Sequence, residues 1–274
     1  MIHVLKPAAP LRGYVRFYAQ LDLHLQERRI LQPIAAHSAP CLDFTFGNTI
    51  AVKSGTALLH QVTWPVAVIG SLTRHRVHLE MHGRVENLTI MFEPGALYRL
   101  LPAQAAEVTD QDYDTRGVFG RGLESLHAQL AELATFEDRA SAVDSYLLRL
   151  LPAQSPRRDV TMTARALHVH DGCLRISGMA DQAGLSVREF ERRFLAQIGV
   201  TPKRYSRIVR FESALKRKNR FPHTRWTDIA HQLGYHDQMH MLHDFKELAG
   251  ATPSNAAPEH DMYVSAEVEG TRQP

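Results

Sequence analysis

The segment ISGMADQAGLSVREFERRFLAQIGVTP at residues 176–202 returns, with its spacing almost unchanged, as WTDIAHQLGYHDQMHMLHDFKELAGATP at residues 226–253. Matching positions lie fifty residues apart up to the glycine of each copy and fifty-one apart beyond it. Each copy therefore predicts a helix, a glycine turn and a second helix, with one extra residue in the second copy's turn. Such pairs are typical of helix-turn-helix units, whose second helix enters the DNA major groove.

Local signals in each copy support helices at these places. Apolar residues at i, i+3, i+4 and i+7 give the first helix one buried face. Gly184 and Gly234 follow the last apolar residue, where a left-handed backbone ends a helix and favours glycine. Ser186 with Glu189 forms a capping box for the second helix, and Asp237 is the matching cap in the other copy. Apolar residues spaced i, i+4 anchor one face of each second helix in the core, so the opposite face points outward.

Positive charge is concentrated around the first unit. Residues 187–220 hold eleven lysines and arginines against three acids, a net charge of +8, while the whole chain carries +3. The remaining residues therefore carry a net charge of −5. This segregation indicates a surface that binds phosphates, although a solvated basic helix is the alternative when charge is taken alone.

Three motifs resemble those of a known family. They are A-x-x-x-G-L-S-x-R-x-F-x-R-x-F at Ala180–Phe194, G-V-T-P-K-R-Y at Gly199–Tyr205, and I-A-x-x-L-G-Y-x-D-Q-x-H with its F-K and T-P followers at Ile229–Pro253. Together they resemble the DNA-binding domain of AraC/XylS-type bacterial transcription regulators. The resemblance implies two units joined by one long helix, which we expect at Lys203–Arg220 between Pro202 and Pro222. It also implies double-stranded DNA and RNA polymerase as partners, with the two second helices in successive major-groove segments.

The resemblance assigns roles to outward residues of these helices. The expected base-reading residues are Arg188, Glu191 and Arg192 in the first unit, and Gln238, Met239, His240, Leu242 and His243 in the second. The expected phosphate contacts are Ser186, Arg193, Lys203, Arg204 and Arg207. The second unit departs from the family pattern, which often has serine, arginine and further basic residues here, whereas this chain has Met239, Leu242, His243, Asp244 and Glu247. We therefore expect weaker phosphate anchoring there, or a surface that faces a partner.

The N-terminal part predicts short strands with aromatic and β-branched residues, separated by glycine, asparagine and proline. The expected strands are Tyr14–Leu23, Arg29–Ile34, Leu42–Phe46, Ile50–Lys53, Thr56–Val62, Val66–Ile69, Arg76–Met81 and Glu86–Phe92. Helical periodicity follows at Leu123–Leu133 and Ala140–Leu151. The fold class is thus α+β, with a β-rich sandwich or small barrel, helices, and an all-α C-terminal domain. The resemblance implies that the β-part is cupin-like and serves as a small-molecule effector pocket, a homodimer interface, or both.

These patterns divide the chain into four parts. We expect a β-rich sensor domain at 1–115, a helical segment and linker at 116–155, the double helix-turn-helix domain at 156–258 and a disordered tail at 259–274. Pro152–Pro156 supplies the linker. The apolar face around Val143 and Leu147 is either core or a dimer seam.

Composition sets further bounds. No secretory leader opens the chain, so we expect it to stay in the cytoplasm. The uncharged stretch Ser54–Thr73 is interrupted by polar residues and predicts strands rather than a membrane span. Cys41 and Cys173 fit buried thiols better than a disulfide.

The histidines offer a metal site as an alternative. On a strand His78, Glu80 and His82 would share one face near His75, as in a cupin metal site, but sixteen histidines make chance clusters common. We expect neither a metal nor a cofactor. His236, His240 and His243 could form a helical metal face, but they lie in or beside a base-reading helix.

Two other functions stay open beside an effector-responsive activator. One is an enzyme, either metal-dependent and cupin-like or a DNA-repair methyltransferase that carries an AraC-type module. The repair chemistry needs an activated cysteine in a P-C-H-R context, whereas Cys41 lies in A-P-C-L-D and Cys173 in D-G-C-L-R. The other is an architectural DNA-binding protein without effector control, for which a β-domain of this size is unnecessary. We therefore expect a regulator without catalytic residues.

Overall fold

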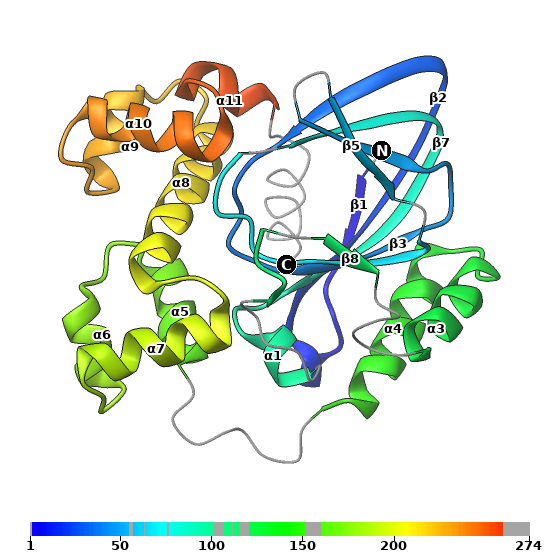
Figure 1. Ribbon diagram of the computed structural model, residues 1–274, viewed down its shortest axis with the longest axis horizontal. Helices are drawn as coiled ribbons and strands as arrows, with labels where there is room; N and C mark the ends of the chain where they lie inside the picture. The colour runs from blue at the N-terminus through cyan, green and yellow to red at the C-terminus, as the bar shows by residue number, and fades with distance from the viewer. Residues whose placement is uncertain are drawn as a thin grey trace.

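A computed structural model describes residues 2–259, except 55–56, 63, 76, 101–106, 111, 115–120 and 152–159. A β-rich domain with its own helices lies beside a C-terminal domain made of helices (Figure 1). This arrangement confirms the predicted α+β class. No helix within the described residues has the length and apolar character needed to cross a membrane.

The β-domain is one antiparallel sheet in which two long strands, β2 and β7, pair along most of their length (Figure 1). Its strands are β1 Ile2–Leu5, β2 Val15–Ile34, β3 Cys41–Thr45, β4 Ile50–Ser54, β5 Ala57–Val62, β6 Val66–Ile69, β7 Val77–Phe92 and β8 Asp112–Asp114. The order is β1-β2-β7-β3-β6-β8, and β4 pairs with both β5 and β7. β3 pairs with Asn87–Met91 and β4 with His78–Glu80, so these two strands pair with successive stretches of β7.

Four predicted strands are really two continuous ones. The prediction broke β2 between Leu23 and Arg29, but the strand continues through a register shift, with Gln26 at φ 50°. The prediction also ended one strand at Met81 and began the next at Glu86, but β7 continues through this segment. Gly83 adopts φ +65° inside β7, where a β-carbon would lie 2.8 Å from the side-chain oxygen of Asn48. The short strands β1 and β8 were not predicted.

The two faces of the sheet have different neighbours because side chains alternate along each strand. One face packs on a short helix, α1 (Ala96–Leu100), and on α3 (Gly122–Ala131) and α4 (Phe136–Arg149). Val143 and Leu147 of α4 are buried in this core, so the apolar face of α4 is core within one chain. The opposite face lines a cavity next to the C-terminal domain.

The C-terminal helices follow the predicted repeat. They are α5 Thr161–Val169, α6 Ile176–Gln182, α7 Val187–Ile198, α8 Pro202–Arg220, α9 Trp226–Gln232, α10 Gln238–Ala249 and α11 Pro253–Glu259. Gly184 and Gly234 adopt φ 64° and 65°, as the turns require. Neither α5 nor α11 was predicted. The proposed linker Pro152–Pro156 and the tail beyond Glu259 lie outside the described residues.

The cysteine prediction is only half correct. Both thiols are free, as expected, and Cys41 is buried, which raises the pKa of its thiol. Cys173 is exposed, because it lies in the short connection between α5 and α6, where its thiol donates to the carbonyl of Leu233.

Candidate nucleic-acid interface

Helix α7 presents a polar, charged face to solvent and buries the other. Phe190 and Phe194 are fully buried, while Arg188, Glu191 and Arg192 are exposed. The hydroxyl of Ser186 accepts a hydrogen bond from the Glu189 backbone N–H at 3.3 Å, which caps the helix. The three residues predicted to read bases thus share the exposed side of a capped helix, near its N-terminus.

The capping box predicted in α7 forms only in part. The Glu189 carboxylate binds two guanidinium groups of its own helix, Arg192 at 2.8 Å and Arg193 at 2.5 Å. These hydrogen bonds, led by those from Arg192, lower the pKa of Glu189 to about 2. Contact of Arg192 with a base would compete with this exposed ion pair, which is the kind of pair that contributes little to stability.

Helix α10 exposes a less basic surface. Its N-terminal cap is Asp237, whose carboxylate accepts from the His240 backbone N–H at 2.7 Å. This hydrogen bond and the nearby His236 lower the pKa of Asp237. The residues predicted to read bases are Gln238, Met239, His240 and His243, which are exposed, and Leu242, which is half-buried.

Helix α8 fixes the spacing of the two units. It has 19 residues and therefore extends about 28 Å, close to the ~34 Å of one turn of B-DNA. Tyr205 and Val209 belong to the core of the first unit, whereas Phe211 and Leu215 belong to the core of the second. One helix thus contributes to both cores, and α7 and α10 are placed at its two ends (Figure 1).

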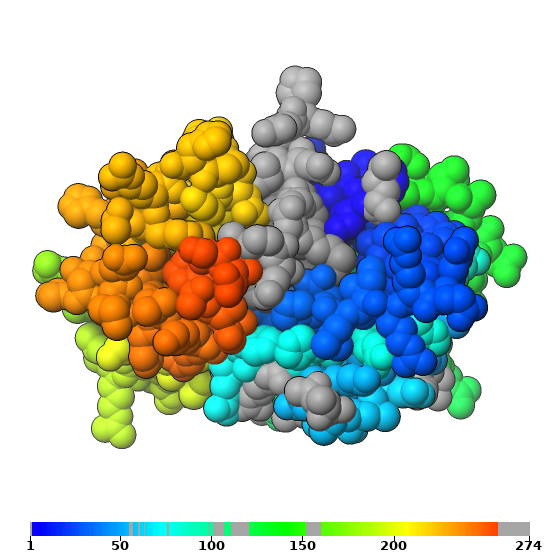
Figure 2. Space-filling model, turned by 90° about the horizontal axis from the view of Figure 1, so that it is seen from above, coloured from blue at the N-terminus to red at the C-terminus, as the bar shows by residue number. Residues whose placement is uncertain are grey.

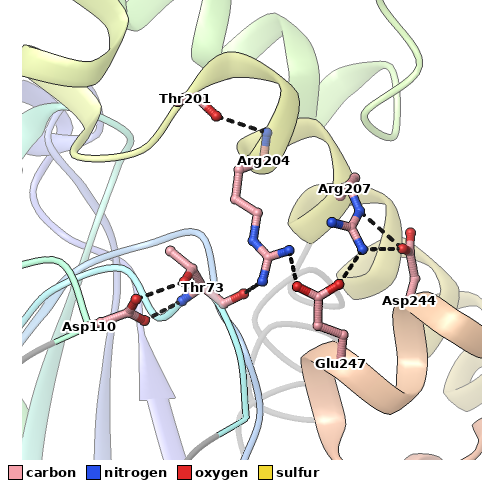
Figure 3. Close-up of polar contacts among 7 residues, drawn as sticks. All are labelled: Thr73, Asp110, Thr201, Arg204, Arg207, Asp244 and Glu247. Carbon is pink, nitrogen blue, oxygen red and sulfur yellow. Dashed lines mark hydrogen bonds and ion pairs between the residues drawn. The ribbon is translucent and has the colours of Figure 1, made fainter.

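Two of the predicted phosphate contacts on α8 have protein partners in this structure (Figure 3). Arg207 donates to Asp244 at 2.6 and 3.0 Å and to Glu247 at 2.6 Å. Arg204 donates to Glu247 and to the backbone carbonyl of Thr73 in the β-domain. Phosphate contact by Arg204 or Arg207 stays a prediction, and it would compete with these bonds. Lys203, in contrast, is exposed at the N-terminal end of α8.

The C-terminal end of α10 is attached to the β-domain. The backbone N–H of Ala36 donates to the Leu248 carbonyl at 2.7 Å, and that of His75 to the Glu247 carbonyl at 3.2 Å. Figure 2 shows the segment that contains α10 and α11, in orange and red, against the strands of the β-domain. The N-terminal end of α10, at Gln238, Met239 and His240, is exposed, while its C-terminal end contacts the β-domain.

A cavity of about 770 Å³ lies between the β-domain and α8. Alternate residues of the strands line it, including Cys41, Asp43 and Thr45 of β3, while Leu42 and Phe44 between them are buried on the other face. The lining from α8 is Phe211, Glu212, Leu215 and Lys216. The joining helix of the C-terminal domain therefore forms part of the cavity wall.

The predicted histidine cluster does not assemble as a metal site in the described structure. Glu80 is bound by Arg29 and Lys53, and His75 is hydrogen-bonded to the Ile34 carbonyl at 2.8 Å. The group whose ligand atoms do lie within 4.8 Å of one another is His243, Asp244 and Glu247 on α10. Arg207 already supplies the cation between these two acids.

The sequence of the C-terminal domain matches a known family over residues 179–257, described as a helix-turn-helix domain. This domain is of the AraC/XylS type. The match extends from α6 to the start of α11 and so includes both units and the joining helix, which confirms the resemblance carried by the three motifs. A chain with this AraC/XylS-type domain is a DNA-binding transcription regulator.

Other comparisons concern the rest of the chain. Residues 3–114 match a domain of unknown function, DUF6597. ToxT from Vibrio cholerae O395 is 10% identical with a TM-score of 0.50, covering 88% of this chain and 97% of ToxT. Wild-type ToxT of strain SCE256 with a bound unsaturated fatty acid is 10% identical with a TM-score of 0.47, covering 87% and 93%. No curated protein matches the sequence. ToxT and this chain share a two-domain fold.

Sequence reasoning missed the residues that join the two domains. The contacts of Arg204 with Thr73, and of Glu212 with Ser38, connect positions more than a hundred residues apart. Neither a periodicity nor a motif signals such pairs. The departure from the family pattern at Asp244 and Glu247 was the one available sign, because acids in a basic domain need local cations.

Proposed function

We propose that the protein is an effector-responsive transcription activator that reads bases with α7 and α10. The observation that carries the proposal is that α8, which joins the two DNA-binding units, also forms a wall of the cavity through Phe211 and Leu215. A ligand in that cavity would contact residues that belong to the core of the second unit. Binding would thus bias the arrangement of the DNA-binding domain, which is the requirement for coupling between two sites.

In this proposal the first unit supplies most of the binding energy. Arg188 and Arg192 suit bidentate hydrogen bonds to guanine, and Glu191 can accept from the amino group of cytosine. The exposure of all three side chains supports the assignment. In the second unit Gln238 suits adenine and Leu242 the methyl group of thymine. Ser186, Arg193 and Lys203 would bind phosphates and set the orientation.

Replacing Arg192 with alanine should weaken binding to the cognate operator by ~1 to 3 kcal/mol and relax the preference at one base pair. The reason is that a bidentate contact to a base edge is lost while the fold stays intact, since Arg192 is exposed. Titration of the variant against operators with each base pair at each position measures both effects. Equal losses on cognate and scrambled duplexes would contradict base reading by Arg192.

Replacing Lys203 with alanine should have a different signature. An exposed lysine at the start of α8 that binds a phosphate contributes to all sequences alike. We expect affinity for cognate and scrambled DNA to fall by the same factor, and the slope of log K against log salt to decrease by about one. A loss confined to the cognate operator, with an unchanged salt slope, would refute the phosphate assignment.

The effector response can be tested even while the operator is unidentified. The full chain is screened against small metabolites by thermal unfolding, and genome-wide mapping of bound sites in a bacterial host supplies the operator. A ligand that raises the unfolding temperature should then change operator affinity, typically by ~5- to 150-fold for coupled sites. If no stabilising ligand changes the operator affinity, the effector response is refuted, and the protein binds DNA without effector control.

If the protein is an activator, RNA polymerase is one of its partners, and it acts in the cytoplasm. Transcription in vitro from the mapped promoter, with purified bacterial RNA polymerase, tests the activator assignment: added protein should increase the transcript. A decrease would show repression. An enzymatic role for Cys41 finds no support, because burial raises the pKa of this thiol and so opposes formation of the thiolate nucleophile.

A further inference from the structure

One acidic side chain of the cavity lining, Asp43, is held by neutral hydrogen-bond donors. Asp43 lies in the middle of β3, where its half-buried side chain borders the cavity. Its carboxylate accepts a hydrogen bond from the Thr89 hydroxyl on β7 at 2.6 Å. The side chain of Asn87, also on β7, is a second neutral donor. The carboxylate is thus held by the sheet in a fixed position.

No lysine or arginine of the described chain forms an ion pair with Asp43. Burial raises the pKa of Asp43 to about 6, although Thr89 and Asn87 lower it. Neutral donors therefore leave the negative charge incompletely compensated. Buried charges in proteins are normally paired, so a carboxylate held like this one is a favourable site for a cation from outside the chain.

Most of the cavity wall around this carboxylate is apolar. Strand residues that line it include Phe17, Ile50, Val52, Ile69, Leu79 and Met91. The volume of about 770 Å³ lies within the ~300 to 1,000 Å³ usual for small-molecule sites. A cavity with apolar walls and few fixed polar groups favours an amphiphilic ligand. The polar group of that ligand must be complementary, in charge and hydrogen bonding, to the polar side chain in the wall.

We propose that the cavity binds an apolar molecule that carries a protonated amine, and that the ammonium group donates hydrogen bonds to Asp43. This inference rests on the proposed function, because it names the chemical class of the effector. A carboxylate accepts at about four lone-pair sites. Thr89 and Asn87 leave acceptor capacity for an ammonium ion. The hydrogen bond would be charge-assisted on both sides, which makes it stronger than one to a neutral hydroxyl.

The opposite ligand class is an apolar carboxylate. The cavity lining also contains Arg16, Arg74 and Lys216, which could attract such an anion, together with Asp110 and Glu212. An anion whose charged end lay at β3 would face the Asp43 carboxylate, which disfavours it. The two classes therefore differ in the sign of charge that binds at Asp43.

Three probes with the same apolar chain separate these classes: n-decylamine, decanol and decanoate. Titration calorimetry on the full chain at neutral pH should show that decylamine binds about tenfold or more tightly than either of the others. Asp43→Asn should weaken decylamine binding by about tenfold or more and leave decanol within about threefold. Tightest binding by decanoate, no binding by any probe, or an unchanged decylamine affinity in the Asp43→Asn variant would overturn the proposal.

Glu212→Gln is the matched control, because Glu212 is the acid of α8 that lines the same cavity. Glutamine keeps an acceptor for the Ser38 backbone N–H, which donates to Glu212 at 2.8 Å. Decylamine affinity should change less than threefold, whereas a loss here in place of the loss at Asp43 would contradict the assignment. Operator binding is measured on the same samples. If the wild-type chain binds its operator specifically but does not bind decylamine, this inference alone is wrong. If the wild-type chain shows no preference for any DNA sequence, the proposed function is wrong.

Discussion

Replacement of Arg207 by leucine should lower the free energy of unfolding of the C-terminal domain by about 3 to 5 kcal/mol, because it leaves a buried carboxylate without its cation. Asp244 is fully buried, and one of its oxygens accepts both hydrogen bonds from Arg207. Trp226 packs against Phe245 at 5.4 Å between ring centroids and reports on this region. Urea unfolding followed by Trp226 fluorescence, in a Trp64→Phe background, measures the loss.

Arg204→Leu provides the matched control for this experiment. Glu247, which loses Arg204, is half-buried and keeps Arg207 as a partner, so the loss should be no more than about 1 kcal/mol. The double variant Arg207→Leu with Asp244→Leu should recover most of the stability, since no unpaired charge is left. An Arg207→Leu variant as stable as Arg204→Leu would contradict this account of the ion pair.

The second large effect is a gain in stability. Asp43→Asn should raise the free energy of unfolding of the ligand-free protein by about 3 kcal/mol above pH 6, because the variant removes a partly desolvated charge whose pKa is raised in the folded state. The pKa of Asp43 is about 6 in the folded protein and about 3.8 in the unfolded chain. The folded state therefore holds the proton more tightly than the unfolded state. Asparagine can still accept from Thr89, whose hydroxyl lies 2.6 Å from the present carboxylate.

The direction of the pH dependence follows from this difference. Above pH 6 the carboxylate is ionised in both states and destabilises only the folded one. As the pH falls from 6 to about 3.8, the folded state becomes neutral first, and the advantage of Asp43→Asn should shrink to zero. Thermal unfolding at several pH values tests this. Asp181→Asn, a substitution at an exposed site on α6, should change little at any pH, and a pH-independent effect of Asp43→Asn would refute the explanation.

The C-terminal domain could be predicted because its signals are local. Gly184 and Gly234 end helices through their own backbone conformation, and Ser186 and Asp237 cap helices through bonds three residues away. Burial of Phe190 also follows from spacing within one helix. Such features depend on neighbours in sequence, so the pattern of residues is enough to indicate them without any tertiary contact.

The β-domain was predicted less completely because its decisive contacts are distant in sequence. The continuity of β2 past Gln26 depends on pairing with β7, about sixty residues away, and this pairing overrides the polar segment that indicated a break. The position of Asp43 opposite Thr89 likewise depends on the register between β3 and β7. A lone aspartate in a strand carries no sign of the cavity that it borders.

The sharing of α8 by both cores has a consequence for the operator. Since no flexible joint separates the two units, the angle between their base-reading surfaces around the double helix is set by the protein. Moving one half-site by about five base pairs, roughly half of the ~10.5-base-pair period, would rotate it to the far side of the duplex. The natural targets of this regulator should therefore keep a constant phase between their two boxes, whatever base pairs lie between them.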